Sequence, residues 1–299
     1  MDFDNFIARA WDDHQNDSQA VARRLLPEGL PLADSAQRCG ALARLAHHMH
    51  GEHRGDWAGG ITALQQVAAQ PAVQADAEVA ATVQRYVLSL QLAAAMVGRE
   101  ARLAALHDGN ITVADHIRIQ AMTAATLAPH HVACAGALLQ QAAAEHEAAA
   151  LPADDPATRA LAVAGNNIAA TLCEAPHLSD AQRHLMIEAA QLASRFWQRA
   201  GGWLEDERAE HRLAEVWLKA GDAAQAQVHA RRCLDIVAAS GDAPLERFFG
   251  QVVLGRAAAA LGHGAAHGHA LAAAQAAFDA LPADDRGWCE PSLAELRAT

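Results

Sequence analysis

Histidine is the residue type in this chain that most plainly offers chemistry, with 17 histidines among 299 residues. Four of them fall in the segment His47-His48-Met49-His50-Gly51-Glu52-His53. Imidazole nitrogen is a common ligand of zinc, copper and nickel, and residues three apart on a helix share one face. His47 and His50 therefore offer a metal site as an alternative reading, which Glu52 or His53 would complete.

The same histidines also have a purely structural explanation, which we prefer. Gly51 ends the expected helix, and histidines in a last helical turn interact favourably with the negative end of the helix dipole. A second cluster, His263, His267 and His269, again lacks a nearby cysteine or a known zinc spacing. We therefore expect no bound metal and no cofactor, and keep a metal site at His47, His50 and His53 as the alternative.

Catalytic motifs are absent from the sequence. The seven serines include none in a Gly-x-Ser-x-Gly elbow. Lys219 is the only lysine and Ala220 follows it, which excludes a phosphate-binding P-loop. Cys233 follows His229 by one helical turn, but a buried packing cysteine explains it better than a nucleophile does. We expect a protein without catalytic activity.

Composition indicates which partners and which cellular compartment to expect. The formal net charge of −12 disfavours a nucleic-acid partner, because phosphate binding depends on lysine and arginine. The five cysteines are scattered and odd in number, as expected for free thiols in a reducing compartment. The first residues lack the features of a signal peptide, and no apolar stretch is long enough to span a bilayer. These features predict a cytoplasmic protein with no membrane partner.

The elements that must position these residues are helices. Hydrophobic residues make up 52% of the chain but aromatic residues only 4%, and alanine, the best helix former, accounts for much of the difference. Glycine and proline breaks separate stretches of helix length, and Thr112, Ser179 and Ser292 begin capping-box patterns. The expected helices run over 2–15, 18–26, 35–50, 57–69, 75–97, 99–107, 112–127, 129–149, 156–174, 179–200, 203–219, 222–239, 243–261, 264–280 and 290–297.

One stretch carries a repeat signature. Leu213-Ala214 is followed by Trp217, then by Gly221 at a turn, and then by Ala226 and Ala230. Small residues let two helices cross closely, and glycine permits the tight turn between them. This pattern resembles the tetratricopeptide repeat (TPR), and weaker matches occur around Ile168-Ala169, Leu254-Gly255 and Leu45-Ala46.

The resemblance implies an all-α fold, a right-handed α-solenoid of antiparallel helical hairpins forming a single domain over 1–299. Within it, 1–26 would be N-terminal capping helices and 35–150 divergent hairpins. The clearest repeats would span 156–281, and 286–299 would be a C-terminal capping segment.

The resemblance further implies a scaffold that holds a protein or peptide partner in a concave groove lined by the first helix of each hairpin. By position, the groove-facing candidates are Asn166, Asn167, Arg208, His211, Glu215 and Lys219. A solvated helix surface explains the same polar residues, since Arg208, Glu215 and Lys219 share one stripe of a helix. A stand-alone sensor of a small peptide or ligand, or a histidine-rich metal-binding protein, are the alternatives.

Overall fold

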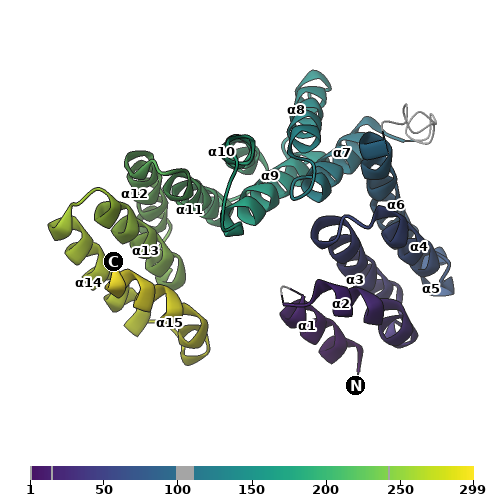
Figure 1. Cartoon of the computed structure of the whole chain (residues 1–299), viewed down its shortest axis with the longest axis horizontal. Coiled ribbons are helices and arrows are strands. Elements are labelled where there is room, and N and C mark those ends of the chain that lie inside the picture. The colour runs from purple at the N-terminus through teal and green to yellow at the C-terminus, as the bar shows by residue number, and fades with distance from the viewer. Residues whose placement is uncertain (1, 15, 99–110, 242) are drawn as a thin grey trace. The chain divides into compact units, whose positions relative to one another are not determined.

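The computed structural model describes residues 2–14, 16–98, 111–241 and 243–299. Every regular element in these ranges is helical (Figure 1), which confirms the predicted all-α class. The helix expected over 99–107 lies outside the described residues. None of the described helices is long and apolar enough to cross a membrane.

Contacts divide the chain into two compact units, Met1–Leu151 and Pro152–Thr299. This boundary coincides with the change from divergent hairpins to clearer repeats in the sequence. The single domain over 1–299 and the right-handed superhelix stay predictions.

The N-terminal unit is a stack of helices with short π and 3₁₀ turns between some of them. Its elements are α1 (Phe3–Asp13), α2 (Ser18–Arg24), the π-helix η1 (Leu25–Gly29), the 3₁₀ turn η2 (Leu30–Leu32), α3 (Ala36–His47), the π-helix η3 (His48–His53), α4 (Trp57–Ala68), α5 (Pro71–Gln74), α6 (Ala77–Gly98), α7 (Val113–Leu127) and α8 (Val132–Ala148). α6 packs on α3, α4 and α7, and α7 packs on α8.

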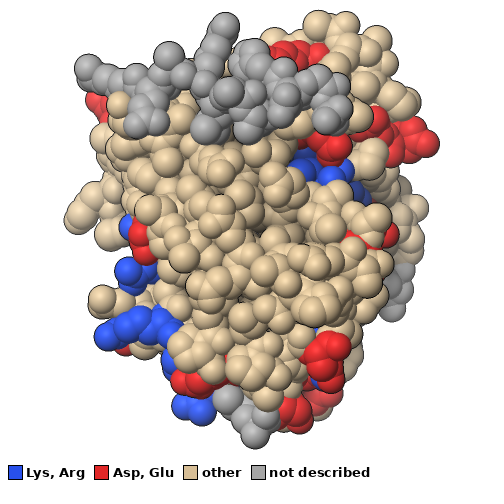
Figure 2. All heavy atoms as spheres, turned by 90° about the vertical axis from the view of Figure 1, so that its right-hand side faces the viewer, with Lys and Arg blue, Asp and Glu red and all other residues tan. Residues whose placement is uncertain are grey.

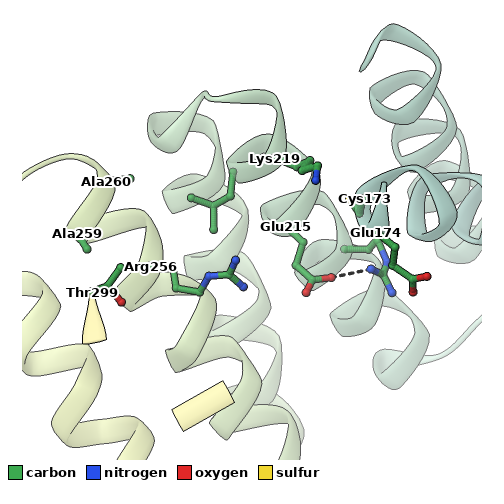
Figure 3. Close-up of a pocket in the computed structure, with 10 residues that line it drawn as sticks. Cys173, Glu174, Glu215, Lys219, Arg256, Ala259, Ala260 and Thr299 are labelled. Atoms are coloured by element: carbon green, nitrogen blue, oxygen red, sulfur yellow. Dashed lines mark hydrogen bonds and ion pairs between the residues drawn. The ribbon is translucent and has the colours of Figure 1, made fainter. Parts of the chain in front are cut away.

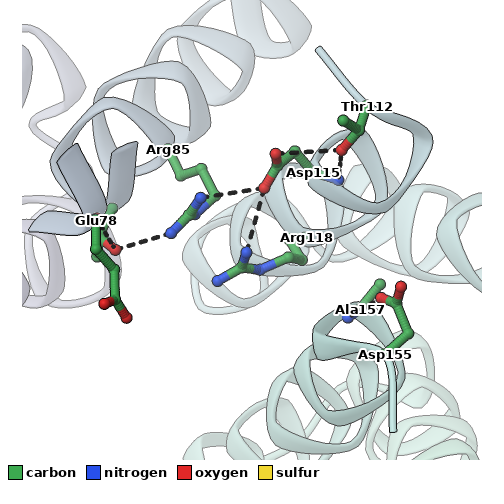
Figure 4. Close-up of polar contacts among 8 residues, drawn as sticks. Glu78, Arg85, Thr112, Asp115, Arg118, Asp155 and Ala157 are labelled. Atoms are coloured by element: carbon green, nitrogen blue, oxygen red, sulfur yellow. Dashed lines mark hydrogen bonds and ion pairs between the residues drawn. The ribbon is translucent and has the colours of Figure 1, made fainter. Parts of the chain in front are cut away.

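One carboxylate joins α6 to α7. Asp115 Oδ1 accepts from Arg85 Nη1 at 3.1 Å and from Arg118 Nη1 at 3.2 Å (Figure 4). The Thr112 hydroxyl caps α7 by accepting from the Asp115 N–H at 3.1 Å, as the capping-box pattern predicts. Asp115 therefore fixes both the start of α7 and its position on α6.

The surface over part of this unit carries few charges. Residues 57–75, which include α4 and α5, contain no aspartate, glutamate, lysine or arginine. Figure 2 turns the side of Figure 1 that bears α4, α5 and α6 toward the viewer, and most of the surface it shows is uncharged. The charged groups visible there lie in small separate groups of both signs.

The C-terminal unit consists of three helical hairpins and a closing helix. The hairpins pair α9 (Pro156–Glu174) with α10 (Asp180–Ala200), α11 (Trp203–Ala220) with α12 (Ala223–Ser240), and α13 (Pro244–Ala260) with α14 (Gly264–Asp279). The closing helix α15 (Ala283–Ala298) packs on α13 and α14 through buried Cys289, Leu293 and Leu296. The first helices α9, α11 and α13 contact one another in sequence.

The best repeat has the packing that its signature requires. Ala214, Ala226 and Ala230 are completely buried between neighbouring helices. Gly221 ends α11 with a φ of 90°, in the left-handed region that glycine adopts without strain.

Two expectations for the helices were wrong. The helix expected over 35–50 ends at His47 and continues as the π-helix His48–His53. The last helix begins at Ala283 instead of near 290, so Ser292 lies inside it and caps nothing. Asp284 and Asp285 in its first turn favour the earlier start, since carboxylates stabilise the positive end of a helix dipole.

Small residues set the spacing between helices in the C-terminal unit. A Cβ atom at Gly165 on α9 would lie 2.6 Å from the carbonyl oxygen of Ala189 on α10. It would also lie 3.1 Å from the Cβ of Ala193. Because the nearest atom belongs to the backbone, no side-chain rotation relieves the overlap, and α9 and α10 can cross this closely only over glycine.

We predict that Gly165→Ala lowers the free energy of unfolding by about 1–3 kcal/mol, the usual cost of overpacking. Gly268→Ala is the matched control, because Gly268 lies inside α14 with no atom within 4 Å of the added methyl group. This control should instead raise stability by roughly 0.5–1 kcal/mol, as expected for alanine in an open helix position. Urea unfolding measures both, and equal stability of the two variants would contradict the close crossing.

Candidate functional site

The C-terminal unit contains a cavity of about 690 Å³ on the side of its first helices (Figure 3). The first helices of three successive hairpins all contribute to its walls. The lining residues are Cys173 and Glu174 of α9, Arg212, Glu215, Leu218 and Lys219 of α11, Arg256, Ala259 and Ala260 of α13, and Thr299.

Unused hydrogen-bond donors face this cavity. The Nε atom of Arg212, which has no hydrogen-bond partner in the described part of the chain, is not among them, because it is buried away from the cavity surface. Lys219 Nζ donates to the Ala175 carbonyl oxygen at 2.5 Å, which uses one of its three protons. Arg256 is exposed and forms no hydrogen bond or ion pair with any described residue.

Two carboxylates supply acceptors in the cavity, and one of them is partly used. Glu215 Oε2 already accepts from Arg212 Nη1 at 2.7 Å, as Figure 3 draws. Glu174 is exposed, and no hydrogen bond or ion pair engages it among the described residues. The lining side chains carry three positive charges, those of Arg212, Lys219 and Arg256. These outnumber the two carboxylates, Glu174 and Glu215, which favours a ligand that bears a carboxylate.

The cavity does not contain a reactive thiol. Burial raises the pKa of Cys173 to about 11, and its Sγ atom lies 3.5 Å from Met186 Sδ. The thiolate is the nucleophilic form of cysteine, so this thiol is unreactive near pH 7.

Two of the six groove candidates, Glu215 and Lys219, line the cavity. Arg208 lies farther toward the start of α11, exposed, and its Nη2 atom pairs with Glu246 Oε1 of α13 at 3.1 Å. His211 is half-buried between Glu215, at 3.8 Å, and the ring of Phe249, whose centroid lies 6.0 Å away. Burial lowers the pKa of His211, so its ring is neutral at pH 7.

The other two candidates lie on α9, outside the lining of the cavity. Asn166 is half-buried and Asn167 is exposed. Their part in binding stays a prediction.

A buried acidic pair that no sequence pattern predicts lies between α11 and α12. Glu207 is only 2% exposed and accepts from Cys233 Sγ at 2.9 Å, while Glu210 Oε2 lies 2.7 Å from His229 Nδ1. Burial raises the pKa of Glu207 to about 7, and burial with the nearby glutamates also raises the pKa of Cys233. Cys233 and His229 thus bond to different carboxylates, and Cys233 has no thiolate character at neutral pH.

The histidines proposed from sequence as metal ligands do not meet. His47 is buried in the core of the N-terminal unit, where its Nε2 atom lies 3.1 Å from Ser89 Oγ and its ring packs on Tyr86. His50 Nδ1 instead lies 3.3 Å from Asp56 Oδ2. The α-helical spacing that grouped His47 with His50 ends at the π-helix, whose wider turn changes the direction of the following side chains.

A different trio of histidines comes together. His14, His48 and His53 each offer a ring nitrogen, and these nitrogens lie within 4.8 Å of one another. His14 follows α1, far from the other two in sequence, so no spacing rule connects it with them. Burial lowers the pKa of His53 to about 4, with smaller contributions from His48 and His14.

Comparisons with known proteins found similar chains among solved structures alone. No protein-family model matches the chain, and no curated protein matches it. Two crystal structures of nearly identical TPR-like repeats from Podosopora anserina, named for kinesin light chain, resemble it. Each is 17% identical and covers 81% of this chain and 93% of its own, with TM-scores of 0.47 and 0.46. A likeness of this size carries no argument about function.

We predict that His47 makes the protein less stable in mild acid. Burial lowers the pKa of its ring to about 4, whereas the ring in the unfolded chain titrates near its ordinary value of about 6.5. Between these values the unfolded chain binds a proton that native His47 does not, so stability falls as the pH falls through this window. His47→Gln should remove up to about 3 kcal/mol of this loss, measured by urea unfolding from pH 7 to pH 4.

The control for this experiment is His177→Gln, because His177 is exposed. It should keep the wild-type dependence of stability on pH. An unchanged dependence in His47→Gln would show that this histidine is not held neutral by the core.

We predict that Glu207 makes the protein less stable as the pH rises, which is opposite to the effect of His47. Its native pKa of about 7 lies above the unfolded value near 4.5, so the native state holds a proton that the unfolded chain has lost. Its contribution to stability therefore decreases as the pH rises from 4.5 to 7. Glu246 strengthens this effect and Arg208 weakens it, and Cys233 donates to the carboxylate.

The test compares Glu207→Gln with Glu188→Gln, whose side chain is exposed on α10. Glu207→Gln should gain stability relative to wild type between pH 5 and pH 8, by up to about 3 kcal/mol. Glu188→Gln should show no such gain. A constant difference between Glu207→Gln and wild type across this range would rule out a protonated Glu207.

Proposed function

We propose that the C-terminal unit is a non-catalytic scaffold that binds a protein or peptide segment in the cavity of α9, α11 and α13. The observation that carries the proposal is that three successive first helices line one cavity, where Lys219 and Arg256 keep unused donors. In a stack of helical hairpins, such a face is continuous from one repeat to the next and suits an extended partner.

The free donors favour a partner segment that bears a carboxylate. Arg256 and Lys219 would bind its oxygens, and a charge-assisted hydrogen bond contributes about 1.5–3 kcal/mol. The C-terminal ends of α9, α11, α13 and α15 all lie near the same cavity, and their dipoles disfavour an anion by about 0.3–1 kcal/mol each. Both direct bonds are therefore needed to offset the combined effect of the dipoles. Glu174 would in turn accept from an N–H group of the partner.

A peptide fits this arrangement better than a nucleic acid does. A peptide supplies both a carboxylate and N–H donors, whereas a phosphate backbone supplies only acceptors and would be repelled by a chain of net charge −12. The other groove candidates, Asn166, Asn167, Arg208 and His211, belong to the same proposal as further contacts along α9 and α11.

A small ligand is the second candidate, and the size of the cavity favours it. A volume of about 690 Å³ lies within the range of about 300–1,000 Å³ that small-molecule sites occupy. A free amino acid or short peptide would use the same donors as a longer segment.

The proposal also places the protein in the cytoplasm. The five cysteines are free thiols, three of them buried, as is usual for a reducing compartment.

The test is binding to a library of fluorescent peptides that carry acidic side chains or a free C-terminal carboxylate, read by anisotropy. The tightest binder should lose about 10- to 100-fold in affinity with Arg256→Ala, since the lost bond is charge-assisted. Amidating or neutralising the peptide carboxylate should lower the affinity for the wild-type chain by about the same factor. The two losses should not add, because they remove the same interaction.

Arg232→Ala is the matched control, since Arg232 is exposed on the second helix α12 and does not line the cavity. It should bind peptides with wild-type affinity. Equal losses for Arg232→Ala and Arg256→Ala would mean that binding depends on general charge, and would contradict a specific cavity site.

A further inference from the structure

We propose that His14, His48 and His53 bind a divalent transition-metal ion in the N-terminal unit. This inference is independent of the proposed function, which concerns the C-terminal unit.

The spacing of the three rings is close to that of a metal site. His48 Nε2 and His53 Nε2 lie 3.1 Å apart. Two nitrogens bound to one tetrahedral zinc ion at about 2.0–2.1 Å are roughly 3.3–3.4 Å apart. One pair of ligands therefore already has the required separation, and the nitrogen of His14 lies within 4.8 Å of both. A modest turn of the His14 ring completes three ligands.

The other nitrogen of two of the rings is already engaged. His48 Nδ1 lies 3.1 Å from Glu52 Oε2, and His14 Nδ1 is hydrogen-bonded to the Trp11 carbonyl oxygen. A proton on Nδ1 leaves Nε2 with a free lone pair, which is the form that binds metal. Metal-binding histidines usually have such a carboxylate or carbonyl partner on the far nitrogen.

The backbone that carries two of the ligands is firmly held. His48 and His53 begin and end the π-helix η3, which packs on α2, α3, α4 and α7. Gly51 lies against Thr126 and Leu90, so closely that a Cβ atom would approach Thr126 Cγ2 to 2.8 Å. His130 Nε2 donates to the Glu52 carbonyl oxygen at 2.9 Å.

The π-helix also explains why these two residues meet. Residues five apart on an α-helix point about 140° away from each other. The wider π turn, with its i→i+5 hydrogen bonding, brings them to one side. Such turns are frequent at functional sites.

Trp11 fixes the third ligand. Its ring centroid lies 5.4 Å from that of His14 and 5.1 Å from that of His48. The Trp11 ring therefore stands beside both histidines and joins the end of α1 to η3.

The ligand set indicates which ions fit. Three imidazoles favour zinc, copper, nickel or cobalt over magnesium or calcium, which prefer oxygen. His53 is exposed, while His14 and His48 are half-buried, so water reaches the fourth coordination position. This is the arrangement of an open, three-histidine zinc site.

The experiment uses the full chain without a histidine tag and Zn²⁺ as the probe. Titration with Zn²⁺ in competition with a chromophoric chelator should show one tight site per chain. The chelator keeps Zn²⁺ from the weaker sites that other surface histidines form. His14→Ala and His53→Ala should each weaken Zn²⁺ binding by at least 100-fold. Glu52→Gln should weaken it by about 10- to 100-fold, as is usual for a residue that orients a ligand.

Two controls separate this site from other histidines. His50→Ala removes a histidine of the same segment that faces Asp56, and His177→Ala removes an exposed histidine of the other unit. Both should keep wild-type affinity, and circular dichroism should show that every variant remains helical. Co²⁺ in place of Zn²⁺ should give the visible spectrum of a four-coordinate site in wild type and lose it in His53→Ala.

The alternative is that His48 and His53 form only a hydrogen bond with each other. In that case the wild-type chain would have no tight Zn²⁺ site, or His14→Ala and His53→Ala would bind Zn²⁺ as tightly as wild type. Either result would overturn the proposal. A loss with His50→Ala equal to that with His53→Ala would also overturn it.

Discussion

Close approach of helix backbones over small side chains is the constraint on which the C-terminal unit depends. Gly165 lets α9 lie against the backbone of α10, and Ala214, Ala226 and Ala230 do the same for the next hairpin. Helices so close leave little room for adjustment, because protein interiors are tightly packed. Val253 of α13 packs on Ala214 and Ala230, so these small residues also hold α13 against α11 and α12 and help to shape the cavity wall.

Tight packing also decides how the buried polar groups behave. His47 and Glu207 are enclosed by helices, and burial favours the neutral form of each: the pKa of His47 is lowered and that of Glu207 is raised. Both have side-chain partners, Ser89 and Cys233, that tolerate the neutral form. The groups at the cavity differ, because Arg256 and Glu174 are exposed and keep their bonding capacity for a ligand.

The sequence predicted the helices well because alanine, capping residues and the turn glycine act locally, as at Thr112 and Gly221. It also placed Glu215 and Lys219 on the helix face that lines the cavity. It failed where distant segments or unusual turns decide the outcome. The π-helix at His48 changes which histidines share a face, and His14 joins them only through tertiary packing. The burial of Glu207 depends on packing against α12, so no local pattern in the sequence marks it.

The central claim is that the cavity of the three first helices is the binding site of the C-terminal unit. Filling it tests this most directly. Ala260 lines the cavity and is exposed, so Ala260→Trp adds a large side chain there without overpacking the core. The measurement is the affinity of this variant for the tightest-binding peptide. An unchanged melting temperature would show that the variant is folded as stably as wild type. The account predicts that binding is lost, and unchanged affinity would contradict it.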